Sequence, residues 1–165
     1  MPLKHAKRFL LSLLLVIPLG SYAVQAPRFS LPSLKSTVDL SAYRGKVVYV
    51  DFWASWCGPC RKSFPWMSDL QERYKDDLKV IAINLDQDRE EAIKFLKEYR
   101  PEFTVAFDPA GKIAEAYKVP GMPTSYLIDQ SGRLVSRHVG FRSKEKDVVE
   151  SRIKTLLSNR QARAN

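Results

Sequence analysis

The stretch KVVYVDFWASWCGPC at residues 46–60 decides how the middle of this chain folds. Its first half, residues 46–53, consists mainly of β-branched and aromatic residues, a composition typical of a strand that is buried on both faces. Its second half ends in two cysteines, Cys57 and Cys60, which are separated by two residues. Because apolar residues recur at helical spacing beyond Cys60, we predict that the strand passes through a turn into a helix. Cys57 then lies at the turn and Cys60 in the first helical turn.

Along the rest of the chain, stretches whose apolar residues have the spacing of a strand alternate with stretches that have the spacing of a helix. Residues 24–45 contain two prolines and are expected to form an extended lead-in. Strands joined by helices run parallel, and the last two strands are expected to form an antiparallel hairpin. The chain therefore predicts an α/β fold with a mixed central sheet and helices on both faces. Further strands are expected over residues 78–85, 103–107, 125–129 and 133–139, and further helices over residues 88–100, 111–117 and 147–157.

The first 23 residues have the pattern of a secretory signal. Two lysines and an arginine precede a short apolar run over residues 9–19, and small residues surround a cleavage point near Ala23. The run is shorter than the about 20 residues that span a bilayer, although an uncleaved signal anchor is the alternative. We therefore expect an exported, periplasmic protein with a folded domain over residues 24–158 and a polar tail over residues 159–165. An uncleaved signal would hold it at the inner membrane.

The composition narrows the range of partners. The 165-residue chain has a formal net charge of +9, and 45% of its residues are hydrophobic, which is sufficient for a core without disulfide staples. The basic residues are scattered, and no nucleic-acid-binding motif accompanies them, so nucleic acid is excluded as an expected partner. The chain has only two cysteines, and they are too close in sequence to tie distant parts of an exported fold together. The pair is therefore better suited to chemistry.

A cysteine at the start of a helix is chemically activated. The thiolate is the attacking form, and the partial positive charge and unpaired N–H groups of a helix N-terminus stabilise it. Pro59 suits the first helical turn because its missing N–H costs nothing there, and Gly58 keeps the approach open. Cys57 is the expected nucleophile, and Cys60 is placed to attack a mixed disulfide on Cys57 and release the product.

Other uses of the cysteine pair remain open at the level of the sequence. An inert local disulfide leaves the neighbouring tryptophans unexplained. A zinc site needs two further ligands, but His138 is the one histidine after residue 23 and is expected on a strand surface. A copper-handling thiol module is a further alternative, because two thiolates are soft ligands that suit Cu(I), and Met122 is the expected neighbour. We expect no resident metal and no cofactor.

Asp51 is an acid inside an otherwise apolar strand. Burial of an unpaired carboxylate is costly, so the pKa of Asp51 is expected to rise. Strand alternation places Asp51 on the same face as Trp53. A carboxyl there, beneath the two cysteines, would accept the proton of Cys60 when that thiol attacks. The alternative is a hydrogen-bonded or partly solvated aspartate without a part in catalysis.

Two segments, VDFWASWCGPC at residues 50–60 and GMPTSYLID at residues 121–129, resemble the active-site segment and the cis-proline loop of the thioredoxin superfamily. The resemblance covers residues 27–158 and is to the exported TlpA/ResA-like branch of thiol–disulfide oxidoreductases. It implies a thioredoxin fold in which the first cysteine is the exposed nucleophile and the second the resolving thiol. It also implies that residues 89–111 form the helix-and-strand insertion of that branch.

The same resemblance implies that Pro123 is cis and faces the nucleophile, whereas the sequence alone leaves the isomer open. The backbone of Met122 would then pair with an extended client segment as an added strand. Trp56, Gly58 and Pro59 complete the expected substrate-binding residues.

One departure from thioredoxin is Ala82, which stands where thioredoxin places a buried lysine beside the aspartate. The proton transfer expected of Asp51 is therefore altered. The dipeptide Gly58-Pro59 is the thioredoxin choice and favours a reducing site. We expect a monomeric reductant of disulfide-containing exported proteins, for example in cytochrome c maturation or cell redox homeostasis, with a membrane thiol reductant as its electron donor. A disulfide oxidase or isomerase is the alternative.

Overall fold

The computed structural model describes residues 24–164, apart from the side chains at positions 143, 145 and 160–164. The predicted signal, residues 1–23, lies outside the described residues. The centre of the fold is a five-stranded sheet in the order β5-β4-β3-β6-β7. Its strands are β3 (Val47–Trp53), β4 (Leu78–Asn84), β5 (Thr104–Phe107), β6 (Thr124–Ile128) and β7 (Leu134–Val139), and the α-helices are α1 (Gly58–Arg73), α2 (Arg89–Tyr99), α3 (Lys112–Ala116) and α4 (Ser143–Ala164).

The strand β3 lies at the centre of the sheet, between β4 and β6. It pairs in parallel with β4, which pairs in parallel with β5, whereas β6 runs antiparallel to both β3 and β7. All seven residues of β3 are buried, which explains why its sequence is apolar without a clean alternation. The predicted order of these elements and the mixed sheet are confirmed.

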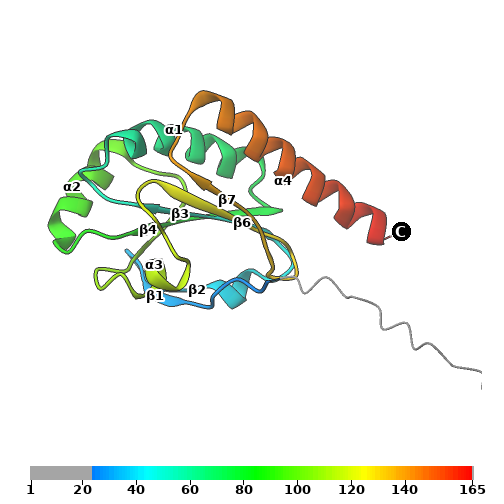
Figure 1. The fold of residues 1–165 in the computed structure, drawn as a ribbon, viewed down its shortest axis with the longest axis horizontal. Helices are drawn as coiled ribbons and strands as arrows, with labels where there is room; N and C mark the ends of the chain where they lie inside the picture. The colour runs from blue at the N-terminus through cyan, green and yellow to red at the C-terminus, as the bar shows by residue number, and fades with distance from the viewer. Residues whose placement is uncertain (1–23, 165) are drawn as a thin grey trace, which may run out of the picture.

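Helices α1, α2 and α4 cover one face of the sheet, and α3 lies on the opposite face with a small two-stranded sheet (Figure 1). Alternate residues of β3 face the first layer, where Trp53 packs against Phe64 of α1 with ring centroids 4.7 Å apart. The residues between them face the second layer, where Phe52 packs against Tyr117 with centroids 5.4 Å apart. Each face of β3 has a core of its own, and helices cover both faces as predicted.

The segment before β3 is more ordered than the extended lead-in that the sequence predicts. Ser30–Pro32 (β1) pairs antiparallel with Thr37–Asp39 (β2), and the 3-10 helix η1 (Leu40–Tyr43) follows. Each three-residue strand turns only its central residue, Leu31 or Val38, into the core. A single inward residue gives no period to detect, which is why the sequence pattern misses these strands.

The helix α4 is longer than its predicted range of residues 147–157. It begins at Ser143 and continues to Ala164, so residues 159–164 of the predicted polar tail are helical. No glycine or proline between these two ends stops the helix. Figure 1 shows its C-terminal part extending beyond the sheet. Within residues 24–164, no helix combines the length and the apolar character needed to cross a membrane.

Candidate redox site

Cys57 and Cys60 form a disulfide at the N-terminus of α1. Cys57 is the N-cap residue, and its Sγ accepts a hydrogen bond of 3.3 Å from the backbone N–H of Cys60. Pro59 occupies the first turn, and no acidic residue lies there. The positive end of the helix thus acts directly on Cys57 Sγ, which is the arrangement that stabilises a thiolate once the disulfide is reduced.

The two sulfur-bearing residues differ in their access to solvent. Cys60 has no exposed surface, whereas Cys57 retains 4% of its own. The resemblance implies an exposed nucleophile, but the disulfide form leaves only this small opening, because Cys57 packs into the same apolar cluster as Trp53 and Met67. Trp56, the residue before Cys57, is 71% exposed. An approaching client therefore meets Cys57 rather than Cys60, beside an exposed indole.

An open depression of ≈ 350 Å³ adjoins this surface. Ser55, Trp56 and Arg61 line one side, and residues of α2, among them Phe95 and Glu98, line the other. Arg61 joins the two sides, because it donates to the backbone oxygen of Ser55 at 2.9 Å and lies 5.6 Å from the centre of the Phe95 ring. The helix that the resemblance assigns to the insertion thus forms a wall beside the site.

A buried polar network holds the loop in front of Cys57. The carboxylate of Asp86 accepts hydrogen bonds from the backbone N–H and the hydroxyl of Ser55, at 2.9 and 3.0 Å, and from the side-chain amide of Asn84 at 2.7 Å. Asn84 ends β4 opposite Trp53, the last residue of β3. Sequence reasoning missed Asn84 and Asp86. Their positions, at the carboxyl end of a buried parallel strand and two residues beyond it, were a signal that could have found them.

The peptide bond between Met122 and Pro123 is cis, as the resemblance implies. Pro123 is buried, and Met122 packs against the apolar cluster that contains both Cys57 and Cys60. The loop before β6 therefore lies in the same layer of the molecule as the disulfide, although the two segments are far apart in the sequence. The fold thus brings together the two segments on which the resemblance rests.

Gly58 does not owe its place to a lack of room. A Cβ at this position would meet no described atom within 4 Å, and the residue is exposed. A Cβ there would point into open space, and the role of Gly58 in keeping the approach open stays a prediction.

Asp51 lies in the middle of β3 and is 2% exposed. Its Oδ2 accepts no hydrogen bond from the described residues, and burial raises the pKa of the carboxyl well above its usual range. Tyr49 and Trp53, two positions away on the same face, belong to the cluster that contains Cys60, so the carboxyl lies in the layer beneath α1. Ala82 stands opposite Asp51 on β4 and supplies no basic partner. The burial and raised pKa expected from the sequence are confirmed.

The remaining histidine of the folded region lies apart from the cysteines. His138 is half-buried on β7, opposite Ser125 of β6. Within the part of the chain that the structure describes, no three histidine, cysteine, aspartate or glutamate side chains gather as a metal ion requires.

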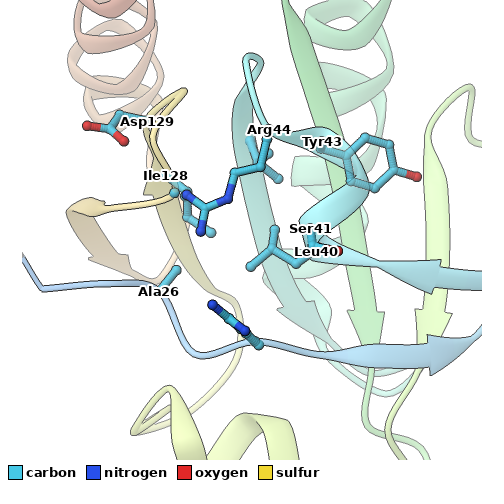
Figure 2. A pocket seen from close by; sticks show the side chains of 10 residues that line it. Ala26, Leu40, Ser41, Tyr43, Arg44, Ile128 and Asp129 are labelled. Carbon is cyan, nitrogen blue, oxygen red and sulfur yellow. The ribbon is translucent and has the colours of Figure 1, made fainter.

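A second cavity, of ≈ 160 Å³, lies on the other side of the sheet (Figure 2). Ala26, Leu40 and Ile128 belong to the core opposite α1, and Arg44 extends toward them from the end of η1 (Figure 2). No residue that lines this cavity belongs to the cluster around the cysteines. Its lining is therefore separate from the cluster that contains the disulfide.

Comparison with known proteins gives concordant results. The model of the Redoxin family matches residues 22–157. The chain is 37% identical to the thiol-disulfide oxidoreductase ResA of Bacillus cereus over 123 residues, which cover 73% of this chain and 71% of that relative.

Solved structures share the fold. One from Chlorobium tepidum, which carries the name thiol:disulfide interchange protein DsbE, has a TM-score of 0.80 and 51% identity and covers 82% of this chain and 96% of its own. An exposed lipoprotein thioredoxin of Streptococcus pneumoniae has a TM-score of 0.70 and 34% identity, and covers 79% of this chain and 100% of its own.

Exchange of disulfides requires a sulfur that is both activated and within reach of a client, and Cys57 at the N-terminus of α1 meets both conditions. The relatives carry the names of proteins that perform this exchange. The chain therefore belongs to the Redoxin family, as a ResA-like thiol–disulfide oxidoreductase of the thioredoxin superfamily.

Proposed function

We propose that the chain is an exported reductant, which transfers electrons from a membrane thiol donor to the disulfides of exported client proteins. The thiolate of reduced Cys57 attacks the client disulfide, forms a mixed disulfide and releases the first client thiol. Cys60 then loses its proton to Asp51 and attacks Cys57 Sγ, which releases the second client thiol and restores the Cys57–Cys60 disulfide. The donor reduces this disulfide by the reverse exchange.

The observation that carries the reducing direction is the buried carboxyl of Asp51 in the layer beneath α1. A site becomes oxidising when it stabilises its reduced, thiolate form. The helix N-terminus stabilises the thiolate of Cys57, but the carboxyl of Asp51 in the apolar layer beneath α1, when it is ionised, repels that negative charge and raises the energy of the reduced form. The balance favours the disulfide form, so the reduced site gives its electrons away. The thioredoxin dipeptide Gly58-Pro59 supports the same direction.

Client recognition is proposed on the surface around Cys57. Trp56 offers exposed apolar area, and the depression between Trp56 and α2 leaves room for an extended segment. The backbone of Met122, before the cis proline, would pair with that segment as an added strand. Pairing through the backbone depends on no particular sequence, which suits a reductant of several clients. Cytochrome c maturation and cell redox homeostasis are the proposed settings.

Export is proposed from residues 1–23, whose sequence has the pattern of a secretory signal. The relative from Streptococcus pneumoniae is named an exposed lipoprotein, which supports the same placement. A periplasm is kept oxidising, so a reductant there needs a continuous supply of electrons, and a thiol reductant in the membrane is the proposed donor. The chain is proposed to act as a periplasmic monomer, anchored at the inner membrane if the signal is retained.

The equilibrium reduction potential of the Cys57–Cys60 pair tests the direction. The protein is titrated against glutathione or dithiothreitol redox buffers, with the fluorescence of Trp56 as the readout. We expect a value near that of thioredoxin, about −270 mV. A value near that of a strong oxidant, about −120 mV, would contradict the proposal and favour a disulfide oxidase or isomerase.

Two variants link that potential to the buried carboxyl. Asp51→Asn removes the group that opposes thiolate formation, so its potential should be less negative than that of the natural chain. Asp76→Asn removes an exposed acid instead and is the matched control. Equal potentials for Asp51→Asn and the natural chain would mean that Asp51 does not set the direction of exchange.

A further inference from the structure

One row of residues crosses four strands of the sheet at the level of Asp51. Ala82 on β4, Asp51 on β3, Ser125 on β6 and His138 on β7 are successive partners in the register of the sheet. Direct partners turn their side chains to the same face, so the row lies on the face that α1 covers. Ala82 brings no polar group, whereas Ser125 brings a hydroxyl and His138 an imidazole. The polar neighbours of Asp51 in this row thus lie on its β6–β7 side.

Burial decreases along the row toward the edge of the sheet. Asp51 is 2% exposed and Ser125 is 4% exposed, whereas His138 is half-buried on the edge strand β7. Directly opposite residues of antiparallel strands have Cβ atoms about 4.5–5.5 Å apart, which places Ser125 between the carboxyl and the imidazole. The row therefore leads from a sealed carboxyl to a half-buried imidazole on the edge strand, whose Nε2 is itself buried.

A small cavity lies beside the outer half of the row. The centre of a water-sized sphere can move within ≈ 10 Å³ of this cavity, which is close to what a single water molecule needs. Ser125, His138 and Lys146 of α4 bring polar groups to the cavity, whose other walls include the side chains of Trp66, Phe141 and Val149. The cavity thus adjoins both the residue that carries the hydroxyl and the residue that carries the imidazole.

We propose that Ser125 and His138 form the path by which Asp51 exchanges its proton with solvent during disulfide exchange. The inference rests on the role proposed above for Asp51. Both residues act through Asp51 and touch no reacting sulfur, so they are positioning residues for its proton.

The proposed step balances in atoms and electrons. When Cys60 attacks the mixed disulfide, its S–H bond breaks and the proton moves to the carboxylate of Asp51. The electron pair of the Cys60 sulfur forms the Cys57–Cys60 bond, while the bond from Cys57 to the client breaks and the client leaves as a thiolate. The proton on Asp51 then passes through the hydroxyl of Ser125 to His138 and on to solvent, and Asp51 is a carboxylate again.

The side chains suit this transfer. A hydroxyl both donates and accepts, so Ser125 passes a proton without changing its charge. An imidazole both accepts and releases a proton at its ring nitrogens, so His138 is suited to receive the proton from Ser125 and pass it on toward solvent. Among the described residues, other groups near the row that can carry a charge are the two cysteines once they are reduced, Tyr49 on β3 and Lys146 on α4. The neighbouring strand β4 adds none, because its residue in the row is Ala82.

Single-turnover kinetics test the proposal because they separate the two chemical steps. Reduced protein is mixed with excess oxidised glutathione and quenched with acid, and the mixed disulfide on Cys57 is counted by mass spectrometry at pH values on both sides of the usual histidine pKa. We expect Ser125→Ala and His138→Gln to slow the decay of the mixed disulfide about tenfold near neutral pH and to leave its formation unchanged. Added imidazole should restore the rate of His138→Gln, and Ser125→Thr should keep the natural rate.

The controls separate the path from the fold and from Asp51 itself. Arg137→Gln changes an exposed neighbour on the opposite face of β7, and the melting temperature of every variant reports on folding. Natural decay rates and pH profiles in Ser125→Ala and His138→Gln would overturn the path, and so would an equal slowing of both steps at every pH. Unchanged decay in Asp51→Asn would overturn the role of Asp51 instead. None of these outcomes depends on the direction of electron flow in the cell.

Discussion

Among the residues that the structure describes, Asp51 has no basic partner. Because burial raises its pKa, the folded chain keeps the proton of Asp51 at pH values where the unfolded chain has released it. Stability is therefore lost as pH rises from the unfolded pKa to the folded one. We expect oxidised Asp51→Asn to be more stable than the natural chain at mildly alkaline pH, by about 1.4 kcal/mol for each unit of difference between the two pKa values. Denaturant unfolding at several pH values measures this.

The advantage of Asp51→Asn should shrink below about pH 4, where the carboxyl is protonated in both the folded and the unfolded chain. A variant that is less stable than the natural chain at every pH would show that the carboxylate has a stabilising partner, and would remove the basis for treating Asp51 as an isolated acid.

Gln71 connects α1 to the first part of β4, where one edge of the strand has no other strand paired to it. β5 pairs with β4 only from Ile81 onward, so the edge from Leu78 to Val80 is open there. The buried amide of Gln71 closes it, because its Nε2 donates to the oxygen of Leu78 at 3.0 Å and its Oε1 accepts from the N–H of Val80 at 2.9 Å. Gln71→Leu leaves both backbone groups buried without partners, so we expect a loss of about 2 kcal/mol or more in the free energy of unfolding.

Urea unfolding compares that variant with Glu72→Gln, an exposed change at the next position. A loss for Gln71→Leu within about 0.5 kcal/mol, the range of ordinary surface changes, would mean that the edge of β4 needs no such partner.

Single residues also show where prediction from one sequence ends. Cys57, Cys60 and Asp51 stand out because their types are unusual for their places in a strand–turn–helix passage. Asp86 could have been marked by its place just past β4, but its bonds to Ser55, 31 positions away, could not be predicted, because the two residues meet only once β3 and β4 lie side by side. The isomer of Pro123 came from the resemblance, since cis bonds are only about 5–6% of those before proline.

At the scale of elements, α1 and α4 are joined by an ion pair. Arg73 at the end of α1 donates two hydrogen bonds to the carboxylate of Glu150 on α4, and the hydroxyl of Tyr74 donates another at 3.2 Å. The bonds from Arg73 are the main reason that the pKa of Glu150 falls to about 2. Glu150 therefore stabilises the fold above its unfolded pKa, and the contribution is lost as pH falls toward the folded value.

We expect Glu150→Gln to cost about 1 kcal/mol or less at neutral pH, because Arg73 is 39% exposed and solvent screens the pair. The cost should decline through the acid range and vanish where the carboxyl is protonated in both states. Denaturant unfolding of both proteins along a pH series measures it, with Asp69→Asn, which removes the other acid beside Arg73, as the control. A cost that stays constant from neutral to acid pH would show that the charge of Glu150 is not what stabilises the contact.

A helix or strand could be predicted from the sequence where its buried residues recur at the spacing of that element. β3 and β4 each bury an apolar run, and both were expected from the sequence. The end of α4 was not, because Leu156 and Leu157 are the last packed ones among its described side chains, and periodicity reports only the packed part of a helix. β1 and β2 were missed for the related reason that each has a single buried residue.

At the scale of the whole molecule, the direction of electron flow is a statement about which redox form the fold stabilises. A fold that stabilises its dithiol makes a strong oxidant, and a fold that stabilises its disulfide makes a reductant. The potentials of a thioredoxin and of a strong oxidant differ by about 150 mV, which corresponds to about 7 kcal/mol for two electrons. An effect of this size is readily measured in the intact chain, without any client or donor.

We therefore expect the oxidised protein to unfold at a higher denaturant concentration than the reduced protein. The helix N-terminus at Cys57 favours the reduced form, but the buried carboxyl of Asp51, when it is ionised, repels the thiolate of Cys57, and the second effect should prevail because both groups are nearly sealed from water. Paired denaturant titrations with and without dithiothreitol measure the difference, and Cys60→Ala, which cannot form the disulfide, should show none. A reduced form more stable than the oxidised one would reverse the assignment and make the protein an acceptor of electrons from its clients.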